Sequence, residues 1–151
     1  MPAAGSGGGA SAALQGSINF PGLAGALRRG FATATTNTGH SGATLGYAID
    51  HPERLMDFGY RAVHEMTVDA KAVIAAYYGD GPKFSYWNGC AAAGRQGMME
   101  VQRFPADYDG VVVSAAANNW SRLQTWSLSM YEATHKDEAR YIPPREIRAH
   151  S

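Results

Sequence analysis

Apolar side chains recur every three or four positions between residues 52 and 79, which is the clearest periodic pattern in the chain. This spacing places them on one face of a helix, so the pattern predicts a long amphipathic helix. The run Gly79-Asp80-Gly81-Pro82 predicts its end, because glycine tolerates a left-handed cap and proline blocks continuation. The apolar positions are Leu55, Phe58, Ala62, Met66, Ala70, Val73 and Tyr77, and charged Arg61, Glu65, Asp69 and Lys71 occupy other faces.

Shorter helical and extended patterns alternate on both sides of this helix. Strands separated by helices at such spacing predict an α/β domain, with a mostly parallel sheet and helices on both of its faces. The pattern predicts helices over residues 18–29 and 92–104, strands over 31–36, 83–87 and 111–113, and a turn over 37–40.

The helix predicted over residues 92–104 has an apolar and a polar face. Met98, Met99 and Val101 are expected to be buried. Arg95, Gln96 and Glu100 are expected on a solvated or interdomain face, with a substrate contact as the less favoured alternative.

Both ends of the chain lack a regular pattern. Residues 1–17 are rich in glycine, alanine and serine, which predicts a loop or a frayed N-terminus. Residues 18–151 are expected to form a partial α/β core with an irregular C-terminal tail. In that tail Asn118-Asn119-Trp120 predicts a loop at the sheet edge, and Pro143-Pro144 disfavours a further helix. A length of 151 residues fits one domain.

The charge balance argues against a polyanionic partner. Thirteen basic residues offset thirteen acidic ones, so neither nucleic acid nor an anionic membrane surface is expected to bind. No apolar run approaches the ~20 residues of a membrane span, and the N-terminus lacks the pattern of a signal peptide. We expect a soluble chain without an assigned compartment. Its single cysteine, Cys90, cannot form an internal disulfide.

The most informative local pattern is the run Gly89-Cys90-Ala91-Ala92-Ala93. It follows a predicted strand and precedes a predicted helix, and its small residues suit the tight G-x-S-x-G turn of α/β-hydrolases. Ala91 occupies the nucleophile position, yet its methyl group has no oxygen or sulfur that could attack a carbonyl. Covalent acyl transfer through this position is therefore expected to be closed.

Several motifs, in order along the chain, resemble the tannase and feruloyl esterase family of serine hydrolases. The resemblance covers roughly residues 16–148, and the joint occurrence of the motifs is more specific than a lone G-x-S-x-G. It implies a partial α/β-hydrolase fold and a carboxylic ester hydrolase that acts on phenolic esters such as gallate or ferulate. The motifs are Arg29-Gly30-Phe31-Ala32, Thr38-Gly39-His40, His51-Pro52-Glu53-Arg54, Asp57-Phe58-Gly59-Tyr60-Arg61-Ala62-Val63-His64-Glu65, Tyr86-Trp87-Asn88-Gly89-Cys90 and Ala117-Asn118-Asn119-Trp120.

The resemblance also implies how the family's active site is built. Its turn has serine at the position of Ala91, and the backbone N–H groups of Ala92 and Gly8 match the two oxyanion-hole donors. The cysteine that matches Cys90 pairs with a cysteine beside the catalytic histidine. The catalytic acid and histidine, the C-terminal strands and a lid domain that often binds calcium have no match in this sequence. Members of the family are often secreted, and no cofactor is predicted.

Two positions of the turn carry further expectations. Ala93 stands at a family glycine position, so its Cβ is expected to crowd the strand and helix and to leave a relaxed or distorted elbow. Cys90 is a conceivable substitute nucleophile, but its register favours a small buried side chain pointing toward the sheet.

The five histidines give no pattern typical of a metal site. His40 is a possible pocket wall, although a loop histidine that satisfies backbone groups is the favoured alternative. His64 and the adjacent glutamate face different directions on the long helix and are expected at the surface. Because His51, His135 and His150 lack ligand partners at helical spacing, no metal is predicted.

Two functions from different classes remain open. The first is an ester hydrolase of the tannase and feruloyl esterase type, in which Ala91 marks the place of the nucleophile. The second is a catalytically silent chain that binds an aromatic ester or a partner chain, including a second copy through an exposed sheet edge. The missing nucleophile favours the silent alternative.

Overall fold

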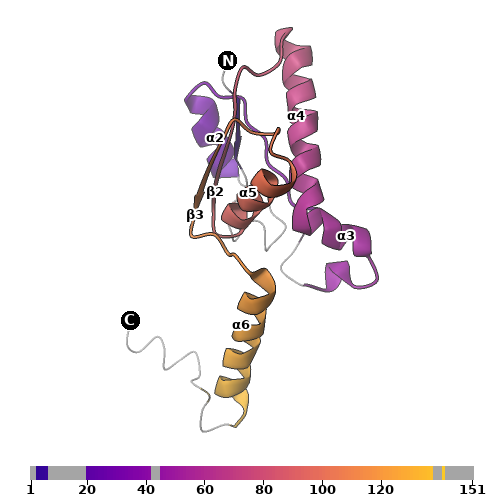
Figure 1. The fold of residues 1–151 in the computed structure, drawn as a ribbon, viewed down its shortest axis with the longest axis vertical. Helices are drawn as coiled ribbons and strands as arrows, with labels where there is room; N and C mark the ends of the chain where they lie inside the picture. The colour runs from indigo at the N-terminus through magenta and orange to yellow at the C-terminus, as the bar shows by residue number, and fades with distance from the viewer. Residues whose placement is uncertain (1–2, 7–19, 42–44, 138–140, 142–151) are drawn as a thin grey trace. The chain divides into compact units, whose positions relative to one another are not determined.

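The computed structural model describes residues 3–6, 20–41, 45–137 and 141. The chain divides into two compact units, Met1–Ala116 and Ala117–Ser151, and each is described by itself. The first unit contains a sheet and most of the helices, as Figure 1 shows.

A parallel sheet lies at the centre of the first unit, with its strands in the order β1, β2, β3. Ser6 pairs with Asn88 and Cys90 pairs with Ser114, so the carboxyl ends of the strands meet at one edge. The parallel pairing confirms the predicted sheet. It also corrects the expectation that residues 1–17 form only a loop or frayed end, because pairing with β2 orders part of that segment. The strands are β1 Ala3–Ser6, β2 Ser85–Cys90 and β3 Gly110–Ser114.

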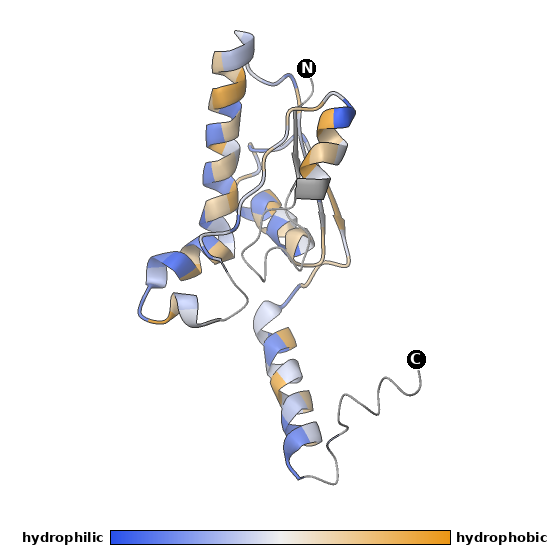
Figure 2. Ribbon diagram, turned by 180° about the vertical axis from the view of Figure 1, so that it is seen from behind, coloured by the Kyte–Doolittle hydropathy of each residue, from blue (hydrophilic) through white to orange (hydrophobic). Residues whose placement is uncertain are grey.

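Helices lie on both sides of the sheet, as expected for an α/β fold. α5 (Ala92–Arg103) packs on β2 and β3, whereas α2 (Phe20–Arg28) contacts β1. Figure 1 shows α5 in front of the strands, and Figure 2 shows α2 in front of them from the opposite side. Both confirm predicted helices. α2 ends before Gly30, whose φ of +82° is left-handed.

The predicted long helix is present, but it consists of three consecutive parts. A π-helical turn, η2, separates two α-helical parts, and this wider turn shifts the side chains around the helix axis. Consequently, the predicted apolar stripe does not stay buried along its length: Val73 and Tyr77 are 67% and 79% exposed. Gly79 ends the helix as predicted, with a φ of +80°. The parts are α3 Pro52–Met56, η2 Asp57–Arg61 and α4 Ala62–Tyr78.

The strand predicted over residues 31–36 is wrong. These residues join no ladder of the described sheet, and Ala32 forms an isolated bridge. β propensity measures how well a side chain packs on a pleated surface, and here the threonines line a groove beside α4 instead. The predicted turn that follows is confirmed, with positive φ values at Thr38 and Gly39. A short 3-10 helix, η1 (Leu45–Ala48), comes next.

The apolar core of the first unit is small. It is centred on Val63, Trp87 and Ala93, and Met66, Tyr108, Val111 and Val113 pack against it while partly buried. β3 is less buried than the sequence predicts, because Val112 is 66% exposed.

α5 buries its polar face, which is the opposite of the prediction. Gly94 and Gly97 share the face that lies against the strands and allow very close approach, so the longer side chains beside them are carried inward. Hydrophobicity alone predicts that polar side chains face solvent, and it does not register the two glycines that lie against the strands. Arg95, Gln96 and Glu100 are buried, Met98 and Met99 are half-buried, and Val101 is exposed.

The second unit contains α6 (Trp120–His135), which corrects the prediction of an irregular tail. Asn119 caps this helix at a φ of +51°, so the run expected as a sheet-edge loop instead leads into a helix. Pro143-Pro144 lies outside the described residues and does not affect residues 120–135. The helix-forming residues of that segment favour α6. In the described parts of the chain, no helix combines the length and apolarity needed to cross a bilayer.

Candidate active site at the turn between β2 and α5

Ala91 occupies the bend between β2 and α5, as the sequence predicts. Its φ and ψ of 55° and −113° lie in a region that residues with a side chain rarely adopt. Its N–H donates to the Ser114 carbonyl over 3.0 Å, and its own carbonyl accepts from the Arg95 N–H over 3.0 Å. The bend is thus tied to β3 on one side and to the first turn of α5 on the other.

Three glycines make this bend possible. A Cβ on Gly89 would collide with the Ala93 carbonyl, and a Cβ on Gly94 would lie 2.8 Å from the Ser114 carbonyl oxygen. A Cβ on Gly97 would lie 2.5 Å from the indole nitrogen of Trp87. Side chains are excluded at Gly89 and Gly94 because backbone lies too close, and at Gly97 because the Trp87 and Val113 side chains fill the space.

The bend is neither relaxed nor distorted, so that expectation is wrong. Ala93 is fully buried, and its carbonyl accepts a 3.0 Å hydrogen bond from the Trp87 indole. The Cβ of Ala93 is therefore accommodated within the core. Ala91 keeps a backbone conformation that costs about 1–3 kcal/mol, which the surrounding contacts must offset.

Cys90 is exposed, which contradicts the expected buried position. Burial alternates along β2, so Trp87 and Gly89 face the core while Cys90 points the other way. The prediction took the wrong face of the strand because position 90 directly precedes the bend.

Only one of the two predicted oxyanion donors lies in the described part of the chain. Ala92 begins α5, and the first N–H groups of a helix have no intrahelical acceptor, so its N–H remains a candidate donor. Gly8 lies outside the described residues. The oxyanion hole therefore stays a prediction.

Arg95 secures the base of the bend to η2. Its guanidinium donates to the carbonyls of Phe58 and Gly59 over 3.3 and 3.4 Å and lies 4.9 Å from the centre of the Phe58 ring. A π-helical turn leaves carbonyls poorly paired, and this cation satisfies two of them. Burial lowers the pKa of Arg95, and burial raises the pKa of nearby Tyr47.

His40 belongs to the same support. Its buried ring stacks on Tyr47 at 4.1 Å and meets the Phe58 ring edge-on at 5.8 Å. Its Nδ1 lies 3.4 Å from the Thr38 carbonyl, in keeping with the alternative in which the histidine satisfies a backbone group. His40 does not line either of the two cavities described below.

A second group of buried polar side chains lies near the other end of α5. Nδ1 of His64 is 2.6 Å from Oδ2 of Asp107, and its ring stacks on Phe104 at 3.8 Å. Glu100 is 1% exposed, and burial together with the nearby Asp107 carboxylate raises its pKa to about 8. The expectation that His64 is a surface residue is therefore wrong. Its partners lie about 40 residues away, and no local pattern marks them.

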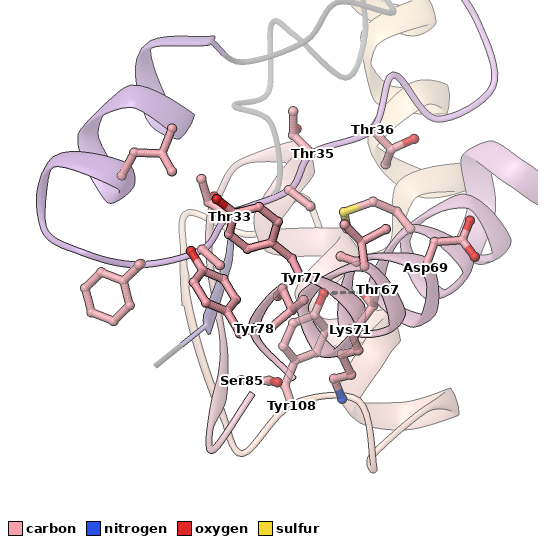
Figure 3. Close-up of a pocket in the computed structure, with 18 of the residues that line it drawn as sticks. Thr33, Thr35, Thr36, Thr67, Asp69, Lys71, Tyr77, Tyr78, Ser85 and Tyr108 are labelled. Carbon is pink, nitrogen blue, oxygen red and sulfur yellow. Dashed lines mark hydrogen bonds between the residues drawn. The ribbon is translucent and has the colours of Figure 1, made fainter. Parts of the chain in front are cut away.

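The larger of two cavities in the described residues lies away from Ala91. It is a groove of about 770 Å³ between α4 and residues 30–36, and Figure 3 shows tyrosines and threonines pointing into it. The Tyr108 hydroxyl, at its floor, bonds to the Thr67 hydroxyl, and burial raises the pKa of Tyr108. A smaller cavity of about 280 Å³ lies beside Glu100 and Phe104.

Comparison with known proteins agrees with this geometry. The family model "Tannase and feruloyl esterase" matches residues 2–150. Feruloyl esterase B of Aspergillus niger is 44% identical over 130 residues, which is 86% of this chain and 24% of that protein. The crystal structure of feruloyl esterase B from Aspergillus oryzae superposes with a TM-score of 0.81 at 37% identity, covering 88% of this chain and 26% of that one.

A third relative widens the comparison to tannases. Tannin acyl hydrolase from Aspergillus niger superposes with a TM-score of 0.71 at 27% identity, over 93% of this chain and 27% of that one. The chain spans about a quarter of the length of these relatives. The family model, the sequence relatives and the solved structures agree, and the chain belongs to the tannase and feruloyl esterase family of α/β-hydrolases.

Proposed function

We propose that this chain carries the nucleophile elbow of a phenolic-ester hydrolase in a form that cannot acylate. The observation that carries the proposal is the backbone of Ala91, which has the strained strand-to-helix geometry of a nucleophile elbow without a nucleophilic atom. The names of the relatives support a phenolic ester, such as a ferulate or gallate ester, as the substrate class.

The chemistry of acyl transfer explains why a methyl group at this position stops the reaction. Ester cleavage of this type needs a hydroxyl to attack, a histidine to take its proton, an acid to orient the histidine and two oxyanion donors. Ala91 removes the first of these, while the backbone N–H of Ala92 needs no side chain. The surviving geometry therefore supports binding of an ester carbonyl without formation of an acyl-enzyme.

Hydrolysis of a chromogenic phenolic ester tests this proposal. The purified chain is expected to give no turnover above a buffer blank. Ala91→Ser restores a hydroxyl at the bend, and Ala76→Ser, on the exposed face of α4, is the control for a hydroxyl added elsewhere. Turnover by the unmodified chain would refute the silent elbow. Turnover by Ala91→Ser alone would mean that the chain supplies a base in place of the family's catalytic histidine.

A second candidate function is binding of an aromatic ester without cleavage. The groove of about 770 Å³ favours it, because its wall combines apolar side chains with the hydroxyls of Tyr77, Tyr78 and Tyr108. Ethyl ferulate should perturb the NMR signals of the groove residues, and Ala70→Trp, which fills the groove, should abolish the change. Ala76→Trp, on the exposed side of α4, should leave it intact.

We also propose that a second copy of the chain pairs along the sheet edge. β1 and β3 are the outer strands of the described sheet, and unpaired strand edges recruit other strands. Light scattering coupled to size exclusion should then give a mass above 16.1 kDa. Val112→Lys, on exposed β3, should reduce that mass, and a monodisperse monomer would contradict the proposal.

A further inference from the structure

Three potential metal ligands from separate parts of the chain converge beneath α5. His64 belongs to α4, Glu100 to α5 and Asp107 to the segment that leads into β3. One ligand atom from each lies within 4.8 Å of the other two. Glu100 and Asp107 are buried and His64 is half-buried, which sets this group apart from carboxylates clustered on a surface.

Glu100 is the least satisfied member of this group. The residue is 1% exposed, and neither carboxylate oxygen meets a donor group among the described residues, while the Asp107 carboxylate lies within hydrogen-bonding reach of its side chain. A buried carboxylate without a donor is strongly destabilised, so it must take up a proton or approach a positive charge.

The donor set indicates which cation suits this position. Calcium and magnesium prefer oxygen ligands throughout, whereas one imidazole nitrogen with two carboxylates suits zinc and neighbouring first-row dications. Oδ2 of Asp107 lies 2.6 Å from Nδ1 of His64, so two of the three potential ligand groups already face one another.

The surroundings provide both support and access. The Lys71 ammonium donates to the backbone carbonyl of Asp107 over 2.6 Å and so holds that segment against α4. The cavity of about 280 Å³ is lined by Glu100, Phe104 and Tyr108 and gives access to the Glu100 side of the group, whereas His64 and Asp107 do not line it. The positive charge of Lys71 repels a metal ion at this site, and the negative charges of the Glu100 and Asp107 carboxylates offset that repulsion.

We propose that His64, Glu100 and Asp107 bind one divalent first-row transition-metal ion, of which Zn²⁺ is the representative. The ion joins α4, α5 and the segment before β3, and it acts as a structural tie. This site is separate from the bend at Ala91 and does not depend on the proposed ester chemistry.

Isothermal titration of the EDTA-treated full chain with ZnCl₂ tests the site. We expect one zinc per chain. Glu100→Gln and Asp107→Asn should each weaken zinc affinity at least ~10-fold, because substitution of residues around a bound metal commonly lowers affinity by that factor. The matched control is Glu53→Gln, because the exposed His51–Glu53 pair, 3.5 Å apart, offers a similar ligand pair at the surface. Cys90→Ser controls for the exposed thiol.

Two results would overturn the proposal. One is equal zinc affinity in Glu100→Gln and the unmodified chain; the other is no stoichiometric binding by the unmodified chain. Co²⁺ titration of the unmodified chain covers the case in which the variants do not fold. Ligand-field absorption that saturates at one equivalent supports the site, and no such absorption refutes it.

Discussion

The two ends of α5 are held by different physical means. At its start, the helix lies too close to the strands for side chains at Gly89, Gly94 and Gly97, and this close packing holds the Ala91 bend. Near its end, Glu100 lies beside two further ionisable side chains, His64 of α4 and Asp107. Packing at the first end depends on shape, so substitutions that change side-chain volume should affect stability there. Packing at the second end depends on ionisable groups, so changes of pH or charge should affect stability there.

The largest effect is expected from adding one methyl group where the helix meets the strand. The Cβ of Gly97→Ala would lie 2.5 Å from the Trp87 indole nitrogen, and overpacking of this kind should lower the free energy of unfolding by about 3 kcal/mol. Urea denaturation measures it. Gly81→Ala is the control, because nothing lies within 4 Å of its Cβ; equal losses in both variants would contradict steric locking.

The charged end should make stability depend on pH in the metal-free chain. The pKa of Glu100 is about 8 in the folded chain against 4.5 ordinarily, so between these values the folded state holds the extra proton. Stability should therefore fall as pH rises from about 4.5 to about 8. Thermal unfolding in EDTA across this range measures the slope.

Glu100→Gln provides the control for that slope, because the amide has the same shape and cannot titrate. The variant should lose the dependence on pH in this window. A slope as steep as that of the unmodified chain would assign the effect to another group.

An intermediate effect is expected where Arg95 links the bend to η2. Arg95→Met keeps much of the packing but leaves the Phe58 and Gly59 carbonyls without this donor, which should cost about 2 kcal/mol. Arg103→Met removes a guanidinium from the Tyr60 ring, 4.3 Å away, at an exposed position and should cost below ~1 kcal/mol. Urea unfolding ranks the two, and the reverse order would refute the role given to Arg95.

The smallest expected effect has the opposite sign. Ala91→Gly should raise the free energy of unfolding by about 1 kcal/mol, because glycine adopts positive φ without strain. Ala93→Gly, at the fully buried second residue of α5, should lower it instead. A loss of stability in Ala91→Gly would mean that the bend is not strained.

The sequence allowed the Ala91 bend to be located because its determinants are local: small residues between a strand pattern and a helix pattern. The parallel sheet and the long helix were predictable for the same reason. The π-helical turn at Asp57–Arg61 was not, since it leaves no mark on a three-to-four-residue repeat.

The buried polar face of α5 was missed for a different reason. Hydrophobicity assigns Arg95 and Glu100 to solvent. Gly94 and Gly97 instead bring that face against the strands, and the groups met there include Phe58 and His64, which lie more than 35 positions away. The extended run at residues 31–36 and the helix of the second unit were misjudged because residue preferences alone do not specify partners.

The hydrogen bond from the Ala91 N–H to the Ser114 carbonyl has a practical consequence for protein engineering. Because neighbouring backbone holds residue 91 in place, a new side chain there should leave the backbone in the same direction as the Ala91 methyl group, whatever its chemistry. A cysteine installed at this position would offer a rigid anchor for a spectroscopic label, at the point where the family's chemistry would begin.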